Sequence, residues 1–311
     1  MARSRDPLPA GGAVAAQVAW ALTRGRMFGA AELVARLVAR PNGAVGLVGT
    51  VVFVLLAVIG PLFFGDQALQ MGNASLAGPS LRHLMGTDEF GRDVLSRVIV
   101  GVRVSLLIGL GAVMVGGLVG VLTGILAGYF GGWVEAIVMR IWDALLAFPS
   151  IFVAIGTAAL LGAGVTNLVV AIAIVNMPTF ARLARAATLA EKKKEYVEAA
   201  RTVGVGPLEI MFGEIWSNIA APIFVAGATS APGAILLAAA LDFLGLGEQP
   251  PAPSLGQMVS ASRQFLQNDP WYALFPGMVL VALVLALSLL GTSLPDALNP
   301  ARRAITRRMS R

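Results

Sequence analysis

The chain has 311 residues, of which 57% are hydrophobic and 13% are charged, and its mean hydropathy is +0.79. Soluble globular proteins carry about 25% charged residues, so this chain lacks the polar surface that a protein surrounded by water needs. We therefore expect a membrane protein. Cysteine is absent and His83 is the single histidine, which excludes disulfides and thiolate sites and argues against a histidine zinc site or a serine triad.

The first 43 residues are basic and mixed in character, and we expect them to form a cytoplasmic N-terminal arm. An apolar stretch at 11–22 is rich in Ala and Gly and matches a signal peptide only weakly, so the arm is predicted to be uncleaved. An amphipathic helix is expected around 28–40, ending at Pro41.

Six apolar segments follow, each near the roughly 20 residues that cross hydrocarbon as a helix. Pro149 lies within the third segment and should bend it, and Gly162, Ala163 and Gly164 make a tight connection between the third and fourth. The sequence predicts an all-α polytopic membrane protein with a six-helix domain over 44–298 and a basic cytoplasmic tail at 299–311. The segments are 44–64, 104–129, 136–161, 165–183, 219–244 and 273–294.

Lysine and arginine set the predicted orientation, because they gather in cytoplasmic segments. Eighteen of the 23 lie in the arm, at Arg140, at Arg182, in the loop at 184–218 or in the tail. Both termini and this loop are therefore expected in the cytoplasm. The net charge of +6, which in a soluble protein would suggest nucleic acid, is explained without a nucleic-acid partner.

A glycine recurs at every fourth position of the second segment, which places these glycines on one face of a helix. Small residues on one face let another helix approach closely, so we interpret this face as a packing surface. Lining of a transport path is the alternative. The glycines are Gly116, Gly120, Gly124 and Gly128.

The loop at 184–218 carries the most informative stretch of the chain. Residues 181–203 are mostly helix formers, so the fourth segment is expected to continue as a helix beyond the membrane. Gly204 suits a helix C-terminus and Pro207 suits the first turn of a new helix. Ala199 and Ala200 should leave a shallow spot flanked by Glu198 and Arg201, suited to a groove on another protein.

The run Glu198-Ala-Ala-x3-Gly204 resembles the cytoplasmic-loop signature of ABC importer permeases, which have the type I importer fold. Further segments make the resemblance specific to the dipeptide, oligopeptide and nickel branch, and to the partner whose first external loop carries a GTD…GRD run. The resemblance covers about residues 40–303. These segments are Gly86-Thr-Asp88-Glu-Phe-Gly91-Arg92-Asp93, Phe243-Leu-Gly-Leu-Gly247 with Pro250-Pro251, and Asp296-Ala-Leu-Asn-Pro300.

The resemblance implies a non-catalytic permease subunit of an importer of peptides or similar solutes, located in a prokaryotic cell membrane. Its implied partners are a second permease, two ATP-binding subunits, an external solute-binding protein and membrane lipid, with ATP and Mg²⁺ bound by the ATP-binding subunits and no cofactor or metal in this chain. The residues it implies for coupling to the ATPase are Glu198, Ala199, Ala200, Arg201, Gly204 and Pro207.

Two parts of the sequence leave the resemblance open to more than one interpretation. Ser217 stands where the family usually has a proline in this loop, and Pro222 is the expected substitute as a helix start. Asp88, Arg92 and Asp93 have two interpretations: a gate or receptor contact, or the polar half of an amphipathic helix at the outer interface.

Two other function classes remain as alternatives. A stand-alone secondary carrier or channel would need ionisable groups at depth, whereas Asp143 and Asp242 fall near segment ends. An intramembrane enzyme would need a nucleophile or metal constellation, and the sequence has none in view. A phosphate-binding loop of the type G-x-x-x-x-G-K-[ST] is also missing, so energy from ATP would have to come through a partner.

Overall fold

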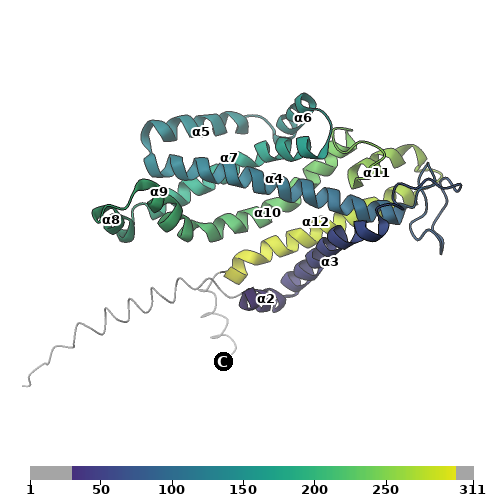
Figure 1. The fold of residues 1–311 in the computed structure, drawn as a ribbon, viewed down its shortest axis with the longest axis horizontal. Helices are drawn as coiled ribbons and strands as arrows, with labels where there is room; N and C mark the ends of the chain where they lie inside the picture. Colours follow the sequence, from purple (N-terminus) through teal and green to yellow (C-terminus); the bar gives the residue numbers. More distant parts are fainter. Residues whose placement is uncertain (1–29, 299–311) are drawn as a thin grey trace, which may run out of the picture.

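The computed structural model describes residues 30–298, which form an elongated helical bundle (Figure 1). Residues 1–29 of the predicted arm and the predicted tail at 299–311 lie outside the described residues. Within 30–298 the helices are α2 Ala30–Val38, α3 Pro41–Phe64, α4 Val94–Phe130, α5 Gly132–Leu146, α6 Ser150–Leu161, α7 Val165–Glu191, α8 Glu195–Thr202, α9 Pro207–Glu209, a π-helical segment Ile210–Ile215, α10 Trp216–Phe243, α11 Leu255–Ser262, a 3₁₀ turn Arg263–Phe265 and α12 Trp271–Leu298.

The all-α prediction with up to six membrane spans is confirmed. Five helical stretches among the described residues are long and apolar enough to cross a membrane: Pro41–Phe64, Val94–Phe130, Val165–Glu191, Pro207–Phe243 and Trp271–Leu298. Most extend several residues beyond the predicted limits, because helices continue past the hydrocarbon where the sequence still favours them. The predicted helix in the arm is also found, as α2, and Pro41 begins α3 as its first residue.

The third predicted segment is two helices instead of one bent helix. α5 ends at Leu146 and α6 begins at Ser150, and the two axes meet at 94°. Pro149 lies at the break, since its ring cannot continue the preceding helix. The pair counts as a sixth span only if the two halves are taken together.

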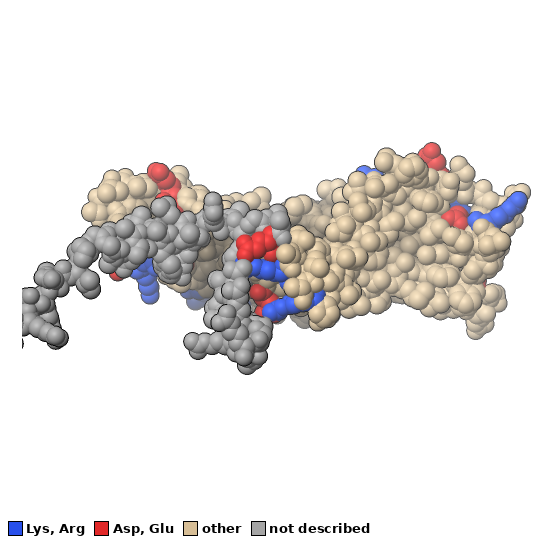
Figure 2. All heavy atoms as spheres, turned by 90° about the horizontal axis from the view of Figure 1, so that it is seen from below, with Lys and Arg blue, Asp and Glu red and all other residues tan. Residues whose placement is uncertain are grey.

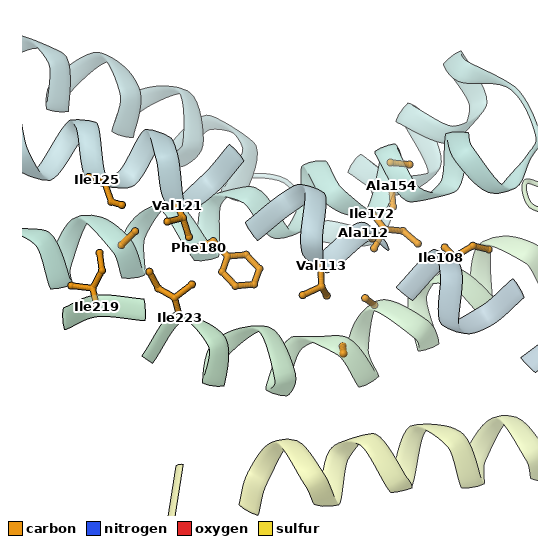
Figure 3. Close-up of a cluster of buried hydrophobic side chains, with 14 of the residues drawn as sticks. Ile108, Ala112, Val113, Val121, Ile125, Ala154, Ile172, Phe180, Ile219 and Ile223 are labelled. Atoms are coloured by element: carbon orange, nitrogen blue, oxygen red, sulfur yellow. The ribbon is translucent and has the colours of Figure 1, made fainter. Parts of the chain in front are cut away.

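Helices α4 and α7 pack against each other along much of their length and run side by side through the middle of the bundle (Figure 1). Around them lies a core of aliphatic and aromatic side chains. Figure 3 shows Phe180 of α7 beside Val121 of α4 and Ile223 of α10, with Ala154 of α6 farther along the cluster. This core holds α4, α6, α7 and α10 as one packed unit.

The four periodic glycines lie on α4 where it contacts α7. A Cβ added at Gly116 would lie 2.7 Å from the carbonyl oxygen of Ala173, and one at Gly128 would lie 2.9 Å from that of Arg185. A Cβ at Gly120 would collide with the carbonyl oxygen of Met177. The contacted residues also advance by four along α7, so the helices are parallel and touch backbone to backbone. We call this contact the glycine seam.

The outer surface separates apolar and charged regions. On the face drawn in Figure 2, Lys, Arg, Asp and Glu lie in the left half and toward the right-hand end, and a broad uncharged surface separates the two groups. α3 exposes large apolar side chains along its length, including Val58, Leu62 and Phe63. An uncharged apolar belt of this kind is what lipid contact requires.

The glycine seam predicts a sharp difference between two neighbouring glycines. Gly120→Ala should lower the free energy of unfolding by about 1–3 kcal/mol, the usual cost of overpacking, because the new methyl group would overlap the α7 backbone. Gly117→Ala is the matched control: its Cβ would lie 3.8 Å from the Phe180 ring, an ordinary contact. The midpoint of thermal unfolding in detergent measures both. Equal unfolding midpoints for the two variants would contradict the close backbone packing at the glycine seam.

Candidate functional site

The segment that carries the loop signature forms a short helical unit at one end of the bundle (Figure 1). We call residues 192–209 the projection. The fourth segment continues as a helix past residue 183, as predicted, but only to Glu191, and a turn at Lys192–Lys194 separates α7 from α8. α8 is therefore a separate helix with its own orientation.

The turn between α8 and α9 is built as a helix-ending motif. Gly204 has φ of +85°, a left-handed conformation that glycine adopts without strain. The N–H of Gly204 donates to the carbonyl of Arg201 at 3.0 Å, and the N–H of Val205 donates to that of Ala200 at 3.0 Å. These two bonds define a Schellman motif. Pro207 then begins α9 as its first residue.

Buried aliphatic residues fix the projection to the bundle. Val197 of α8 is fully buried, as are Ile210, Met211 and Ile215 of the π-helical segment. α9 continues through this segment into α10, so Pro207–Phe243 is one continuous helical stretch. Pro222 lies inside α10 and starts no helix, which corrects the expectation for it. The α9 end of the projection is therefore continuous with a membrane-crossing helix.

Polar contacts add a second attachment, to the ends of α7 and α4. The hydroxyl of Tyr196 donates to Glu191 Oε2 at 2.8 Å. Burial raises the pKa of Tyr196, and Glu191 beside it raises that pKa further, so the hydroxyl stays protonated and keeps donating at neutral pH. The Arg201 guanidinium stacks 5.2 Å from the centre of the Tyr129 ring at the end of α4.

The outward side of the projection combines charge with exposed apolar surface. Glu198, Ala199 and Arg201 are exposed. Ala200 is half-buried against the core, so the expected shallow spot opens at Ala199 alone. Val203 is 79% exposed and Leu208 is 66% exposed. Exposed large apolar side chains beside charges are typical of a protein-binding surface.

The opposite end of the bundle carries an ordered loop, residues 65–93, which we call the cap. Asp88 is fully buried there. Its Oδ2 accepts a hydrogen bond from Arg92 Nε at 2.6 Å and lies 3.3 Å from Arg97 Nε. Its Oδ1 accepts from the backbone N–H groups of Phe90 and Arg92, both at 2.9 Å. One carboxylate thus fixes a turn and neutralises two buried guanidinium groups.

Asp93 begins the helix that follows the cap. Its Oδ2 accepts from the backbone N–H of Ser96 at 2.8 Å, which makes Asp93 the N-cap of α4. Its Oδ1 lies 3.0 Å from Nδ1 of His83. The interpretation of Asp88, Arg92 and Asp93 as the polar half of an amphipathic helix is wrong. The three lie in a loop, and two of them are buried.

Comparison with known proteins places these features in one family. The sequence profile described as "Binding-protein-dependent transport system inner membrane component" matches residues 120–304, more than half of the chain. The chain belongs to this family. The match includes the C-terminal part of the glycine seam and the whole of the projection. The protein is therefore a membrane-embedded permease component of a transport system of the ABC importer class.

Curated relatives cover most of the permease. It is 42% identical over 262 residues to a dipeptide transport system permease protein DppC of Alkalihalophilus pseudofirmus, covering 84% of this chain and 86% of the relative. It is 42% identical over 266 residues to a di/tripeptide transport system permease protein DppC of Pseudomonas aeruginosa, covering 82% and 88%. A glutathione transport system permease protein GsiD of Salmonella typhimurium is 47% identical over 223 residues, covering 72% and 74%.

Sequence reasoning missed several residues of the permease that the structure brings forward. Arg97 looked like an ordinary external charge, yet it is buried and donates to the carbonyl oxygens of Ala68 at 3.0 Å and Pro251 at 3.2 Å. Arg97 precedes an apolar segment in the same helix, and this position was the feature of the sequence that could have indicated its burial. Val203 and Leu208 were missed because an apolar residue in a loop signature gives no sign of its exposure.

The structure of the cap predicts that loss of the Asp88 carboxylate strongly lowers the stability of the protein. Asp88→Asn should lower the free energy of unfolding by about 3–5 kcal/mol, because it removes the nearest counter-charge of two buried guanidinium groups. Asp66→Asn in the same loop should have little effect, since Asp66 is exposed. Thermal unfolding of the purified permease in detergent compares the two variants. Unchanged stability of Asp88→Asn would show that the buried ion pairs do not hold the cap.

Proposed function

We propose that this permease is a non-catalytic subunit of an ATP-driven importer for peptides or similar small solutes, and that it forms half of the translocation path. The family match and the peptide and glutathione transport named for its relatives support this function. The observation that carries it is the projection: a rigid unit with exposed Val203 and Leu208 and no long apolar span of its own.

The projection is the proposed docking site for an ATP-binding subunit. Glu198, Ala199 and Arg201 supply a charged rim around a small side chain, and Val203 and Leu208 supply apolar contacts. Gly204 and Pro207 set the shape of this surface through the backbone. Two ATP-binding subunits would bind ATP and Mg²⁺, one on this chain and one on a second, similar permease. An external solute-binding protein would deliver the cargo.

Positive charge supports an orientation with the projection in the cytoplasm. At that end of the bundle lie Lys192, Lys193, Lys194 and Arg201, together with Arg182 and Arg185 near the end of α7. An excess of Lys and Arg marks cytoplasmic segments. The cap then faces outward, toward the solute-binding protein. With this orientation both termini are cytoplasmic, as the sequence predicts.

The proposed mechanism follows from the attachments of the projection. When the ATP-binding subunits close on ATP, they would displace α8 and α9. The displacement reaches α10 directly, because α9 is continuous with it, and reaches α4 through the Arg201–Tyr129 contact. The helices would then rearrange between outward-open and inward-open states, and ATP hydrolysis would reset the cycle. Side chains of this chain take no part in hydrolysis.

Gly204→Val tests the docking role. A β-branched residue is strongly disfavoured at φ of +85°, so the turn should be lost and ATP-driven uptake should fall at least tenfold while membrane insertion persists. Gly206→Val is the matched control, because Gly206 has φ of −68° and a Cβ at either glycine would meet open space. Uptake of dialanine into proteoliposomes holding the purified importer measures both variants.

Two results would defeat the proposal. Normal ATP-driven uptake by Gly204→Val would show that the turn is not needed for coupling. Uptake driven by a solute or proton gradient in liposomes that hold this chain alone would instead favour a secondary carrier or channel.

A further inference from the structure

A hollow of about 450 Å³ opens between α6, α7 and α10, and its polar lining is uncharged. We call it the polar hollow. Its volume lies within the range of about 300–1,000 Å³ that is typical of small-molecule sites. The polar side chains are Ser150, Asn176, Thr229 and Ser230.

The polar hollow lies at mid-depth in the bundle. Ser230 is near the middle of α10 (Trp216–Phe243), about 20 Å from either end at about 1.5 Å per residue. Thr229 precedes it, and Asn176 lies in the interior of α7, a span in its own right. These polar groups are therefore in the part of the chain that crosses hydrocarbon.

Part of the hydrogen-bonding capacity in the polar hollow is unused. Thr229 donates to carbonyls of its own helix, and the Asn176 amide donates to the Ile172 carbonyl at 2.9 Å. The Asn176 Oδ1 remains as an acceptor. Within residues 30–298, the hydroxyls of Ser150 and Ser230 have no hydrogen-bond partner. The surface thus offers both donors and acceptors to something outside the chain.

Contact with lipid does not suit these groups. Hydrocarbon leaves a polar group without a partner, and polar residues inside membranes usually face water or the interior of an assembly. The exposed side chains of α3 at Val58, Leu62 and Phe63 show the contrasting apolar surface. The polar hollow must therefore face a wet path or another molecule.

We infer that the polar hollow is this chain's mid-membrane contribution to the transport path, and that it holds the main-chain amides of an extended peptide-like solute. Amide N–H and C=O groups match neutral hydroxyl and amide side chains. Val175, Leu236 and Leu237 form an apolar wall beside the polar groups, where the solute's side chains pack. The inference rests on the proposed import function and adds the class of contact made with the cargo.

The absence of charged side chains from the lining supports a neutral occupant. Asp, Glu, Lys and Arg are missing from the lining, so the polar hollow does not neutralise a charged terminus or a metal chelate. A second hollow, between α5 and α7, is lined by charges, but its carboxylates already pair with arginines: Asp143 with Arg182, and Glu135 with Arg185. Of the two hollows, the neutral one offers uncharged donors and acceptors and contains no charged side chain in its lining.

Gly233→Leu tests the polar hollow by filling it. A Cβ at Gly233 would meet nothing within 4 Å, and leucine favours helix over glycine, so folding should be preserved. ATP-driven uptake of labelled dialanine, trialanine or glutathione should fall at least tenfold, with basal ATP hydrolysis within twofold of wild type. Gly277→Leu on α12 is the matched control, because it also faces open space but lies outside the lining.

A cysteine probe tests water and cargo at the same place. The chain has no native cysteine, so Ser230→Cys reports one position. In the assembled importer this thiol should react with a charged methanethiosulfonate reagent, and the transported peptide should slow the reaction at least threefold. Leu285→Cys is the depth-matched control, at the middle of α12 and 55% exposed on an apolar surface. It should stay unreactive.

The outcomes separate the two proposals. Wild type without ATP-driven uptake of any of the three peptides defeats the import function, and this inference with it. Wild-type uptake together with normal transport by Gly233→Leu overturns the inference alone. An unreactive Ser230→Cys also overturns it, and so does a reactive one that peptide fails to protect.

Discussion

The backbone contact between α4 and α7 determines the arrangement of the rest of the permease. Four glycines spaced by four residues let α4 lie against successive carbonyls of α7. In a membrane, where apolar side chains gain little by leaving lipid, such close packing is a principal source of helix association. The seam fixes the direction of α7, and the end of α7 determines where α8 begins. It also leaves the other faces of the two helices for α6 and α10, which complete the core.

The two ends of this bundle are built by different physical means. At the cap, a buried carboxylate and two buried guanidinium groups hold a loop without helices, and the cost of burying these charges is offset by their mutual pairing and backbone bonds. At the projection, aliphatic side chains are buried and the charges stay exposed. The cap is therefore suited to hold one shape, while the projection joins an exposed surface to the continuous helix Pro207–Phe243.

Turns and helix breaks that depend on neighbouring residues were predictable from the sequence, whereas contacts between distant segments were not. Gly204 and Pro207 set a turn through their own backbone preferences. Pro149 interrupts a helix because it lacks an N–H. Residues close together in the chain therefore suffice to predict both features. The 94° angle at Pro149 depends on how α6 packs against α7. The glycine period indicated a packing face, yet with 57% hydrophobic residues no pattern selects α7 as its partner. The burial of Asp88 was missed because one of its two arginine partners, Arg97, lies beyond the motif.

The central claim is that the projection docks an ATP-binding subunit, and site-specific photocrosslinking tests it most directly. A photoreactive residue would replace Val203, which is 79% exposed on the projection, and in a second variant Leu81, which is fully exposed on the cap. In native membranes, position 203 should crosslink to an ATP-binding protein and position 81 should not. Crosslinks from position 203 to lipid alone, or to the ATP-binding protein equally from both positions, would contradict the account.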